Sequence, residues 1–202
     1  MYVCHRRRYV RRGERDEESR HQGPGREALV SGGRRLHVTP HDDTGGSVRR
    51  VADESELADA LAVRRAVFVD EQGVPPDLEA DDFDELGGAT HFVAYDGDRA
   101  VGAARLRPSD GRTAADAGDD ERAKVERVAV RSAERGEGWG ARLMDAVEAD
   151  ARDRGFDHLV LHAQTAVEGF YAVRGYERVG EEFEEAGIPH VEMVLELCDG
   201  SS

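Results

Sequence analysis

RGEGWG, residues 135–140, is the stretch that decides the fold of this chain. It follows the apolar run VERVAV (residues 125–130) and opens the amphipathic run ARLMDAVEADARDR (residues 141–154). A strand, a glycine-rich turn and a helix start in this order leave unpaired backbone N–H groups at the positive end of a helix dipole. A glycine at every second position of the turn lets an anion approach the backbone, because a side chain would hold it away. The stretch therefore predicts a phosphate-binding turn.

Charge is unevenly distributed along the 202 residues of the chain, whose formal net charge is −15. Residues 1–47 carry 10 Arg and 7 acidic residues, whereas residues 48–202 carry 18 basic and 36 acidic residues. Lys124 is the only lysine beside 27 arginines, a composition that fits both a halophile-like, acidic proteome and the bias of a GC-rich genome. So negative a charge argues against nucleic acid as a partner of residues 48–202 and favours a cationic substrate.

The amino-terminal segment, residues 1–47, contains arginine clusters and few large apolar residues, and it shows neither a helix nor a strand period. We expect it to be a disordered, basic extension of a folded domain that covers residues 48–198, with residues 199–202 as a tail. Two interpretations of the extension stay open. It is either an arm that binds nucleic acid through residues 6–15 or a stretch that is not part of the expressed protein.

The two cysteines, Cys4 and Cys198, lie near opposite ends of the sequence and have neither metal-binding nor disulfide spacing. No run of residues approaches the roughly 18–20 apolar residues that a membrane span needs. The paired arginines Arg11 and Arg12 are not followed by an apolar segment, so they do not indicate an export signal. We therefore expect a cytoplasmic protein that binds no metal and contacts no membrane.

Apolar periodicity divides residues 48–197 into alternating strands and helices. Asp53 and Glu56 have the spacing of a capping box and start the first helix, and the turn Asp96-Gly97-Asp98 joins two strands in a hairpin. The predicted strands cover residues 48–52, 90–95, 100–107, 125–130, 159–161, 176–180 and 191–197, and the predicted helices cover residues 54–73, 141–154 and 166–174. The pattern indicates an α+β fold with a mixed, mostly antiparallel central sheet flanked by helices.

Four segments resemble, in this order, the GNAT superfamily of N-acetyltransferases. They are VERVAV (residues 125–130), the turn Arg135-x-x-Gly138-x-Gly140, LHAQ (residues 161–164) and FYAVRGY (residues 170–176). Three further segments resemble the YjcF- and ElaA-like branch of this superfamily. They are VFVDEQGVP (residues 67–75), the pair Thr90-His91 and GIPHVEM (residues 187–193). The resemblance covers about residues 48–197 and is specific because the segments keep the order of the family.

The resemblance implies acetyl-CoA as the donor and a central sheet that splays at the acetyl-CoA site. The turn would hold the pyrophosphate through backbone N–H groups, and the strand before it would pair with the pantetheine arm as with an added strand. Arg131 and Arg142 stand beside the turn and would add positive charge for the phosphate, but ordinary solvated arginines near a helix end would give the same sequence. The expected acetyl-CoA-binding residues are Val128, Ala129, Val130, Arg135, Gly136, Glu137, Gly138, Trp139, Gly140 and Ala141.

The resemblance also implies a catalytic acid. Tyr171 matches the family's tyrosine that protonates the departing thiolate, and a phenol is a suitable donor for this step. The alternative is that Tyr171 is a core aromatic beside Phe170.

The general base has several candidates. Glu126 comes first, because some family members carry a catalytic carboxylate on this strand and its side chain should point away from those of Val125 and Arg127. An ion pair with an arginine would explain Glu126 equally well. His162 comes second, since imidazole titrates near neutrality. A relay through water would need no dedicated base.

Acceptor-binding residues are expected on several parts of the chain. In this fold Glu71, Gln72 and the acidic loop that ends near Asp84 would overhang the acceptor site, where carboxylates suit an amine, although charge runs are usually solvated. Three histidines would line the acceptor pocket or form hydrogen bonds near strand ends, namely His91, His162 and His190.

We therefore expect an enzyme, an N-acetyltransferase that moves the acetyl group of acetyl-CoA directly to a primary amine of a small molecule within a ternary complex. The alternatives are an amino-sugar-phosphate or protein amine as acceptor, and a non-catalytic regulator that binds acyl-CoA. A sugar phosphate would need two converging arginines, for which Arg64, Arg65 and Arg105 are the nearby candidates. A homodimer would be in keeping with the resemblance.

Overall fold

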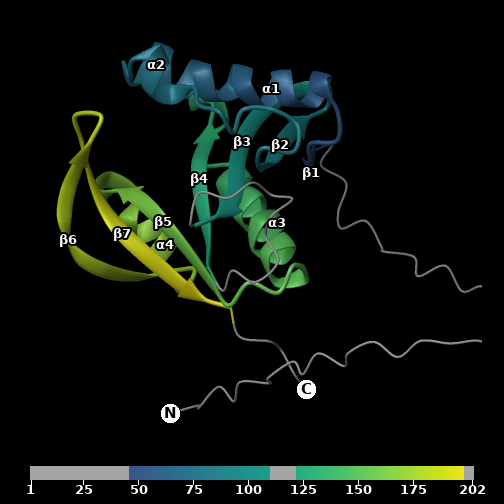
Figure 1. The fold of residues 1–202 in the computed structure, drawn as a ribbon. Helices are drawn as coiled ribbons and strands as arrows, with labels where there is room; N and C mark the ends of the chain where they lie inside the picture. The colour runs from purple at the N-terminus through teal and green to yellow at the C-terminus, as the bar shows by residue number, and fades with distance from the viewer. Residues whose placement is uncertain (1–45, 110–121, 198–202) are drawn as a thin grey trace, which may run out of the picture. The chain divides into compact units, whose positions relative to one another are not determined.

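The computed structural model describes residues 46–109 and 122–197 of the chain (Figure 1). The expected basic extension lies outside these residues except for its last two, and so do the tail and most of the loop that follows residue 108. The first strand begins at Gly46, two residues before the predicted start of the domain. The described residues include every strand and helix that the sequence predicts.

A seven-stranded sheet forms the centre of the domain, with the strand order β1-β2-β3-β4-β5-β7-β6 (Figure 1). The strands are β1 (Gly46–Arg50), β2 (Thr90–Asp96), β3 (Arg99–Pro108), β4 (Arg122–Val130), β5 (His158–Gln164), β6 (Glu177–Glu185) and β7 (Ile188–Glu196). Neighbouring strands are antiparallel except for β4 and β5, which run parallel. The predicted α+β fold with a mostly antiparallel sheet is confirmed.

Helices cover both faces of the sheet. The helical elements are α1 (Glu54–Arg64), its continuation η1 (Arg65–Glu71), α2 (Pro76–Glu79), η3 (Ser132–Glu134), α3 (Trp139–Asp153), η4 (Thr165–Val167) and α4 (Glu168–Ala172). Val93 and Ala103 pack with residues of α1 and η1, whereas Phe92 and Ala94 pack with residues of α3. Successive residues of β2 thus face different helices, which explains why this strand is apolar on both sides. None of the helices in the described part of the chain is long and apolar enough to cross a membrane.

The first predicted helix forms in two parts. Asp53 caps α1 by accepting a hydrogen bond from the backbone N–H of Glu56 at 2.9 Å, and the Glu56 carboxylate accepts one from the N–H of Ala52 at 2.9 Å. The predicted cap is therefore confirmed. After α1 the helix widens into the π-helix η1, where the N–H of Gln72 reaches back to the carbonyl of Val67. Wide turns of this kind often occur at functional sites.

β4 and β5 separate halfway along β4. They pair only where residues 122–125 lie beside residues 158–161. From Glu126 onward, the side of β4 that faces β5 has no strand partner among the described residues. The sheet is therefore splayed at the place where the resemblance predicts the acetyl-CoA site.

A β-bulge in β4 lies where the two strands part. Ala103 of β3 pairs with Ala129 and Arg105 pairs with Glu126, so that two residues of β4 stand opposite one of β3. The first of the two, Arg127, has a φ of 54°, in the left-handed region that residues other than glycine rarely adopt. A bulge breaks the alternation of a strand. Glu126 and Arg127 consequently join one network of ion pairs, and the expectation that they point to opposite faces is wrong.

The hairpin of β6 and β7 is longer than the sequence predicts. The strand expected over residues 176–180 continues to Glu185, and the chain turns at Ala186 and Gly187, which both have positive φ. The additional residues are mostly glutamates, which give no alternation of apolar and polar positions. The predicted end of this strand is therefore wrong.

Candidate active site

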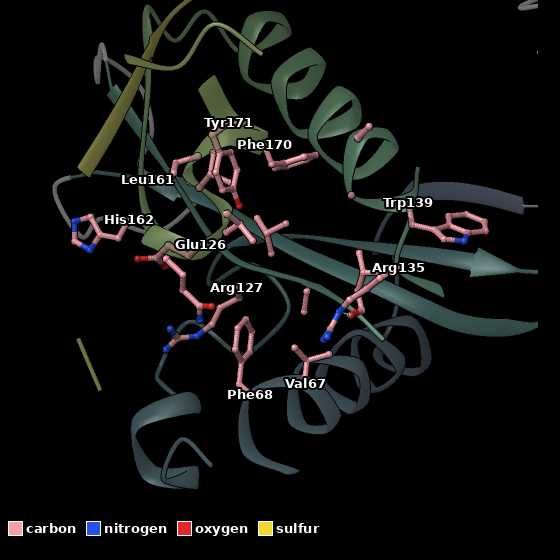
Figure 2. Close-up of a pocket in the computed structure, with 18 of the residues that line it drawn as sticks. Val67, Phe68, Glu126, Arg127, Arg135, Trp139, Leu161, His162, Phe170 and Tyr171 are labelled. Atoms are coloured by element: carbon pink, nitrogen blue, oxygen red, sulfur yellow. Dashed lines mark hydrogen bonds between the residues drawn. The ribbon is translucent and has the colours of Figure 1, made fainter. Parts of the chain in front are cut away.

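A cavity of about 710 Å³ lies in the gap between β4 and β5 (Figure 2). Its walls come from β4, the glycine turn, β5, η1, the η4–α4 segment and the hairpin of β6 and β7. In Figure 2, Arg135 lies on one side of the cavity, Glu126, Arg127 and His162 lie on the other, and Tyr171 lies between them. The cavity thus has a turn end, formed by the glycine turn with Arg135, and a far end, formed by Glu126, Arg127 and His162.

The glycine turn leads from β4 into α3. Gly136 and Gly138 both have a φ of 85°, and no atom lies within 4 Å of the place where either Cβ would stand. Gly138 is the N-cap of α3 and no side chain caps this helix, so the first backbone N–H groups of α3 have no partner among the described residues. Gly136, Gly138, Gly140 and Ala141 line the cavity. This geometry suits an anion.

Three residues of the turn differ from expectation. Gly140 does not have positive φ, and a Cβ there would make an ordinary contact of 3.4 Å with the ring of Phe170, so neither the backbone conformation nor the packing requires glycine at this position. Glu137 is not part of the cavity wall. The ring of Trp139 is buried against Gly46, where a side chain would not fit, and Figure 2 shows it directed away from the cavity. The turn therefore contributes mainly backbone to the cavity.

Arg135 forms a two-pronged ion pair with Glu71 at the end of η1, with N–O distances of 2.6 and 2.8 Å. Its Nε also donates to the backbone carbonyl of Val130 at 3.0 Å. The hydrogen bonds from Arg135 lower the pKa of Glu71, so this carboxylate is ionised at neutral pH. The sequence places Glu71 at the acceptor site, whereas in the structure it lies beside the turn and outside the cavity wall.

Tyr171 of α4 lies in the gap between β4 and β5, and its side chain is buried. Its ring packs edge to face on the rings of Phe170, at 4.9 Å, and Tyr176, at 5.7 Å. The hydroxyl forms no hydrogen bond with the described residues, although it belongs to the cavity wall. Burial raises the pKa of Tyr171 to about 12, against the weaker opposite effect of the Arg174 charge. The phenol is therefore protonated and available to a ligand.

Glu126 is surrounded by three cations. Its carboxylate accepts hydrogen bonds from Arg105 at 2.7 Å and from Arg107 at 2.9 Å, and Lys124 lies 3.2 Å away. Burial alone would raise the pKa of Glu126, but the hydrogen bonds from Arg107 and the three positive charges outweigh it and bring this pKa to about 2. Glu126 lines the cavity, yet the geometry favours the ion-pair interpretation over that of a proton acceptor.

Buried arginines hold the acidic loop between α2 and β2. Arg64 binds Glu79 at 2.6 Å and Asp84 at 2.9 Å, and Arg105 binds Asp81 at 2.6 Å. Both arginine side chains are only 1% exposed. Glu79, Asp81 and Asp84 are therefore already paired with arginines, whereas Asp82 and Glu85 are exposed outside the cavity wall. Because both guanidiniums are occupied, they are not open to a sugar phosphate.

His91 lies outside the cavity wall. It is buried on β2, and its Nε2 lies 3.0 Å from the carbonyl oxygen of Phe83 in the acidic loop. Burial and the nearby positive charges of Arg64 and Arg105 lower the pKa of His91. The structure thus connects His91 to the loop and does not bring it to the acceptor site.

His162 and His190 both line the far end of the cavity. Nδ1 of His162 lies 2.9 Å from a carboxylate oxygen of Glu185, and Nδ1 of His190 lies 2.8 Å from the carbonyl oxygen of Ile188. The ring of Phe183 contacts both imidazoles, with centroid distances of 4.8 and 6.1 Å. The hairpin of β6 and β7 therefore fixes the position of both histidines.

Gln72 also lines the cavity, as the sequence predicts. Its Oε1 accepts a hydrogen bond of 2.9 Å from Nε2 of Gln164 on β5. This contact ties the end of η1 to the strand on the other side of the gap. Within residues 46–109 and 122–197, no three His, Cys, Asp or Glu side chains gather in a way that would hold a metal ion.

The structure adds wall residues that the sequence analysis does not single out. They include Phe68, Lys124, Arg127 and Glu185. The charges of Lys124 and Arg127 interrupt an apolar strand, which is a signal that sequence reasoning can use. Glu185 stands in a run of glutamates and Phe68 in an apolar helix segment, where no local signal distinguishes them.

A sheet that splays beside a glycine turn at the start of a helix defines a class, the acyl-CoA-dependent acyltransferases. The family model described as the acetyltransferase (GNAT) domain matches residues 53–197. The chain belongs to this GNAT acetyltransferase family.

Known relatives agree with this assignment. An uncharacterised N-acetyltransferase of Bacillus subtilis, YjcF, is 40% identical over 143 residues, which are 70% of this chain and 94% of YjcF. The crystal structure of Escherichia coli ElaA is similar with a TM-score of 0.64 and 31% identity, over 75% of this chain and 99% of that one. An acyl-CoA N-acyltransferase from Pseudomonas aeruginosa matches with a TM-score of 0.61 and 29% identity, over 74% of this chain and 97% of its own. The predicted resemblance to the YjcF- and ElaA-like branch is confirmed.

Proposed function

We propose that this protein transfers the acetyl group of acetyl-CoA to a primary amine of a small molecule, directly and within a ternary complex. The observation that carries the proposal is the Tyr171 hydroxyl, which stands in the gap between β4 and β5 without a hydrogen-bond partner among the described residues. Family membership supplies acyl transfer from a CoA thioester. The acetyl group, the small amine and the residue roles below are our proposal.

The residues of the turn end fit acetyl-CoA. Open space stands where Gly136 and Gly138 lack side chains, and the first N–H groups of α3 are unpaired among the described residues, as a pyrophosphate requires. Beyond Val125, the edge of β4 that faces β5 has no strand partner in the described part of the chain, so it offers backbone groups to an extended pantetheine arm. Bound acetyl-CoA would supply the activated thioester.

Tyr171 is the proposed proton donor. When the amine nitrogen forms its bond to the acetyl carbon and the carbon–sulfur bond breaks, Tyr171 gives its proton to the leaving thiolate. Its pKa of about 12 keeps the hydroxyl protonated until that step. A backbone N–H on the free edge of β4 near Val128 would polarise the thioester carbonyl.

His162 is the proposed proton acceptor, in place of Glu126. A carboxylate with a pKa of about 2 that is held by three cations is a weak base for an ammonium group. In the tautomer whose Nδ1–H donates a hydrogen bond to Glu185, at 2.9 Å, Nε2 has the lone pair that takes the proton of the amine, directly or through water. The carboxylate of Glu192 lies 3.7 Å from this Nε2. A carboxylate that orients an imidazole as Glu185 does is a common support for a general base.

Thiol release from acetyl-CoA tests the proposal. The full chain is incubated with amino acids, amino sugars, polyamines and peptides at low and high salt, and free thiol is measured together with the mass of the acetylated product. We expect release with at least one small amine. Tight binding of CoA in a calorimeter without release by any amine would instead identify a non-catalytic acyl-CoA-binding protein.

A further inference from the structure

Two arginines at the far end differ in how fully their donors are used. Arg105 donates five hydrogen bonds to three carboxylates, those of Asp81, Asp84 and Glu126, and its side chain is 1% exposed. A guanidinium has five N–H donors, so this arginine is fully occupied.

Arg127 is satisfied much less well. Its one hydrogen bond to the described residues goes to the carbonyl of Leu78 at 3.2 Å. Its closest approaches to carboxylates are longer, 3.8 Å to Glu79 and 3.5 Å to Asp81. Its Nε is buried and has no hydrogen-bond partner in the described part of the chain. Nε is too buried to meet a ligand itself, but among the described residues the two terminal nitrogens make only the one hydrogen bond to Leu78, so they keep donors for an anion in the cavity.

The backbone places this unsatisfied group in the cavity. Arg127 lies at the bulge of β4 with a φ of 54°, and its side chain belongs to the cavity wall. Left-handed backbone at a long side chain is unfavourable, and such positions tend to occur where a ligand is bound. The bulge directs the guanidinium to the far end, on the same side as Glu126 in Figure 2.

The charges of the ion-pair network that contains Arg127 are not balanced. The ion-pair network within the described residues has five cations and four carboxylates. They are Arg64, Arg105, Arg107, Lys124 and Arg127, and Glu79, Asp81, Asp84 and Glu126. Three carboxylates line the cavity. Glu126 pairs with three cations at the far end, Glu185 forms a hydrogen bond with the His162 imidazole, and Glu134, next to the glycine turn, pairs with Arg99. The network around Arg127 thus has one cation in excess, and Arg127 makes no hydrogen bond to a carboxylate of the described residues.

We propose that Arg127 binds an anionic group, a carboxylate or a phosphate, on the amine acceptor. The inference rests on the proposed acetyl transfer and specifies its acceptor as a small amine that also carries an acid. The acid would lie at the far end against Arg127, and the amine would then lie toward Tyr171, between the two ends of the cavity (Figure 2). A planar guanidinium with unused donors suits either oxyanion.

Paired acceptors test this assignment. Thiol release is measured for L-amino acids beside their methyl esters and for phosphoethanolamine beside ethanolamine, with wild type, Arg127→Gln and the control Arg65→Gln. Arg65 is exposed on η1 and is not part of the cavity wall. Because each variant is compared with wild type on the same compound, differences in amine pKa between the compounds do not affect the result. The two sets of pairs separate a carboxylate from a phosphate.

We expect Arg127→Gln to lower kcat/KM for the anionic acceptors about 30-fold or more, because loss of one partner of a desolvated charge pair has an effect of this size. The kcat/KM for the neutral counterparts should change less than about threefold. The control Arg65→Gln should leave kcat/KM unchanged for both the anionic and the neutral compounds. A loss of equal size for anionic and neutral compounds would show that Arg127 only supports the fold. Wild type that prefers the neutral compounds would also overturn the inference.

Two further measurements keep the test decisive. If Arg127→Gln does not melt cooperatively, Arg127→Lys retains the charge but loses the planar fork, and it should still weaken anionic acceptors selectively. Binding of the same compounds to the CoA-loaded protein is measured by calorimetry. If wild type binds the anionic amines, Arg127→Gln does not, and no compound releases thiol, then the role of Arg127 in anion binding stands and the proposed acetyl transfer is refuted.

Discussion

Glu71 and Arg135, which are 64 residues apart in the sequence, bind each other through two parallel hydrogen bonds of 2.6 and 2.8 Å. The pair joins the end of η1 to the head of the glycine turn. Its side chains are 39% and 44% exposed, so it adds little to the stability of the fold. A phosphate at the turn would compete with Glu71 for the same guanidinium. We therefore predict that Glu71 is an exchangeable partner of Arg135.

Glu71→Gln should strengthen the binding of CoA, because it removes the competing carboxylate while Arg135 stays in place. An exposed ion pair is worth about 1 kcal/mol or less, so we expect the dissociation constant to fall by up to about fivefold. Calorimetric titration with CoA at two salt concentrations measures the change. Glu177→Gln, an exposed position on β6, is the matched control. Weaker binding by Glu71→Gln would mean that the ion pair holds the turn in its binding conformation.

Tyr171→Phe should lower kcat by about 10²-fold or more and leave the affinity for CoA unchanged, since only the proton donor is lost. The ring contacts with Phe170 and Tyr176 remain in this variant, so the melting temperature should change little. Single-turnover thiol release and CoA calorimetry provide the two measurements. Unaltered turnover would remove Tyr171 from the chemistry.

Glu126→Gln should destabilise the protein at neutral pH, because Arg105 and Arg107 then lose a buried partner. The pKa of Glu126 is about 2 in the folded protein against 4.5 for an ordinary glutamate, which corresponds to about 3 kcal/mol. Since this pKa is lowered, the contribution is present above pH 4.5 and is lost as the pH falls toward 2.

Urea unfolding of wild type and Glu126→Gln between pH 3 and pH 7 checks this dependence. The difference in unfolding free energy should be largest at neutral pH and should shrink below about pH 4.5. Asp81 and Asp84, whose pKa values are also lowered, titrate in both proteins and share Arg105 with Glu126, so the difference between the two proteins includes their coupling to Glu126. A difference that does not depend on pH would contradict the ion-pair account of Glu126.

Alanine at two glycines of the turn should have different effects. Gly138→Ala places a side chain at a φ of 85°, which costs about 1–2 kcal/mol. It also adds a methyl group to the turn that we propose to bind the pyrophosphate, so CoA binding should weaken. Gly140→Ala lies within α3 at an ordinary φ, and its methyl would meet Phe170 at a normal contact distance of 3.4 Å. Alanine there should change stability by less than about 1 kcal/mol. Thermal melting and CoA titration of both variants measure the contrast.

The sequence predicts the parts of the site that depend on local order. The turn at residues 135–140, the strand before it and Tyr171 follow from short motifs, and the structure brings all three to one cavity. The bulge at Arg127 could not be predicted in this way, because it arises from the pairing of β4 with β3. The pairing of Glu71 with Arg135 depends on tertiary structure for the same reason.

The ends of strands and the surroundings of single side chains are also hard to predict from local sequence. Alternation of apolar and polar residues identified the strands that have an apolar face. It predicted the end of β6 at residue 180, five residues too early, because the glutamates that follow resemble a loop. The sequence left two roles open for His91, the acceptor pocket and a hydrogen bond near a strand end, and the fold decides for the second, because its imidazole contacts the carbonyl of Phe83. Motif order therefore located the turn end of the cavity better than the far end.

Lys124 gives the chain an unusual chemical property. It is the only lysine of the sequence, and it lies in the cavity wall beside Glu126. Apart from the α-amine of the chain, no other amino group exists on the protein that a thioester or an activated ester could acylate. An amine-directed fluorophore or cross-linker would thus react with two groups, Lys124 in the cavity wall and the α-amine. The guanidiniums, which are all the other side-chain cations apart from histidines, would neither consume the donor nor carry the label.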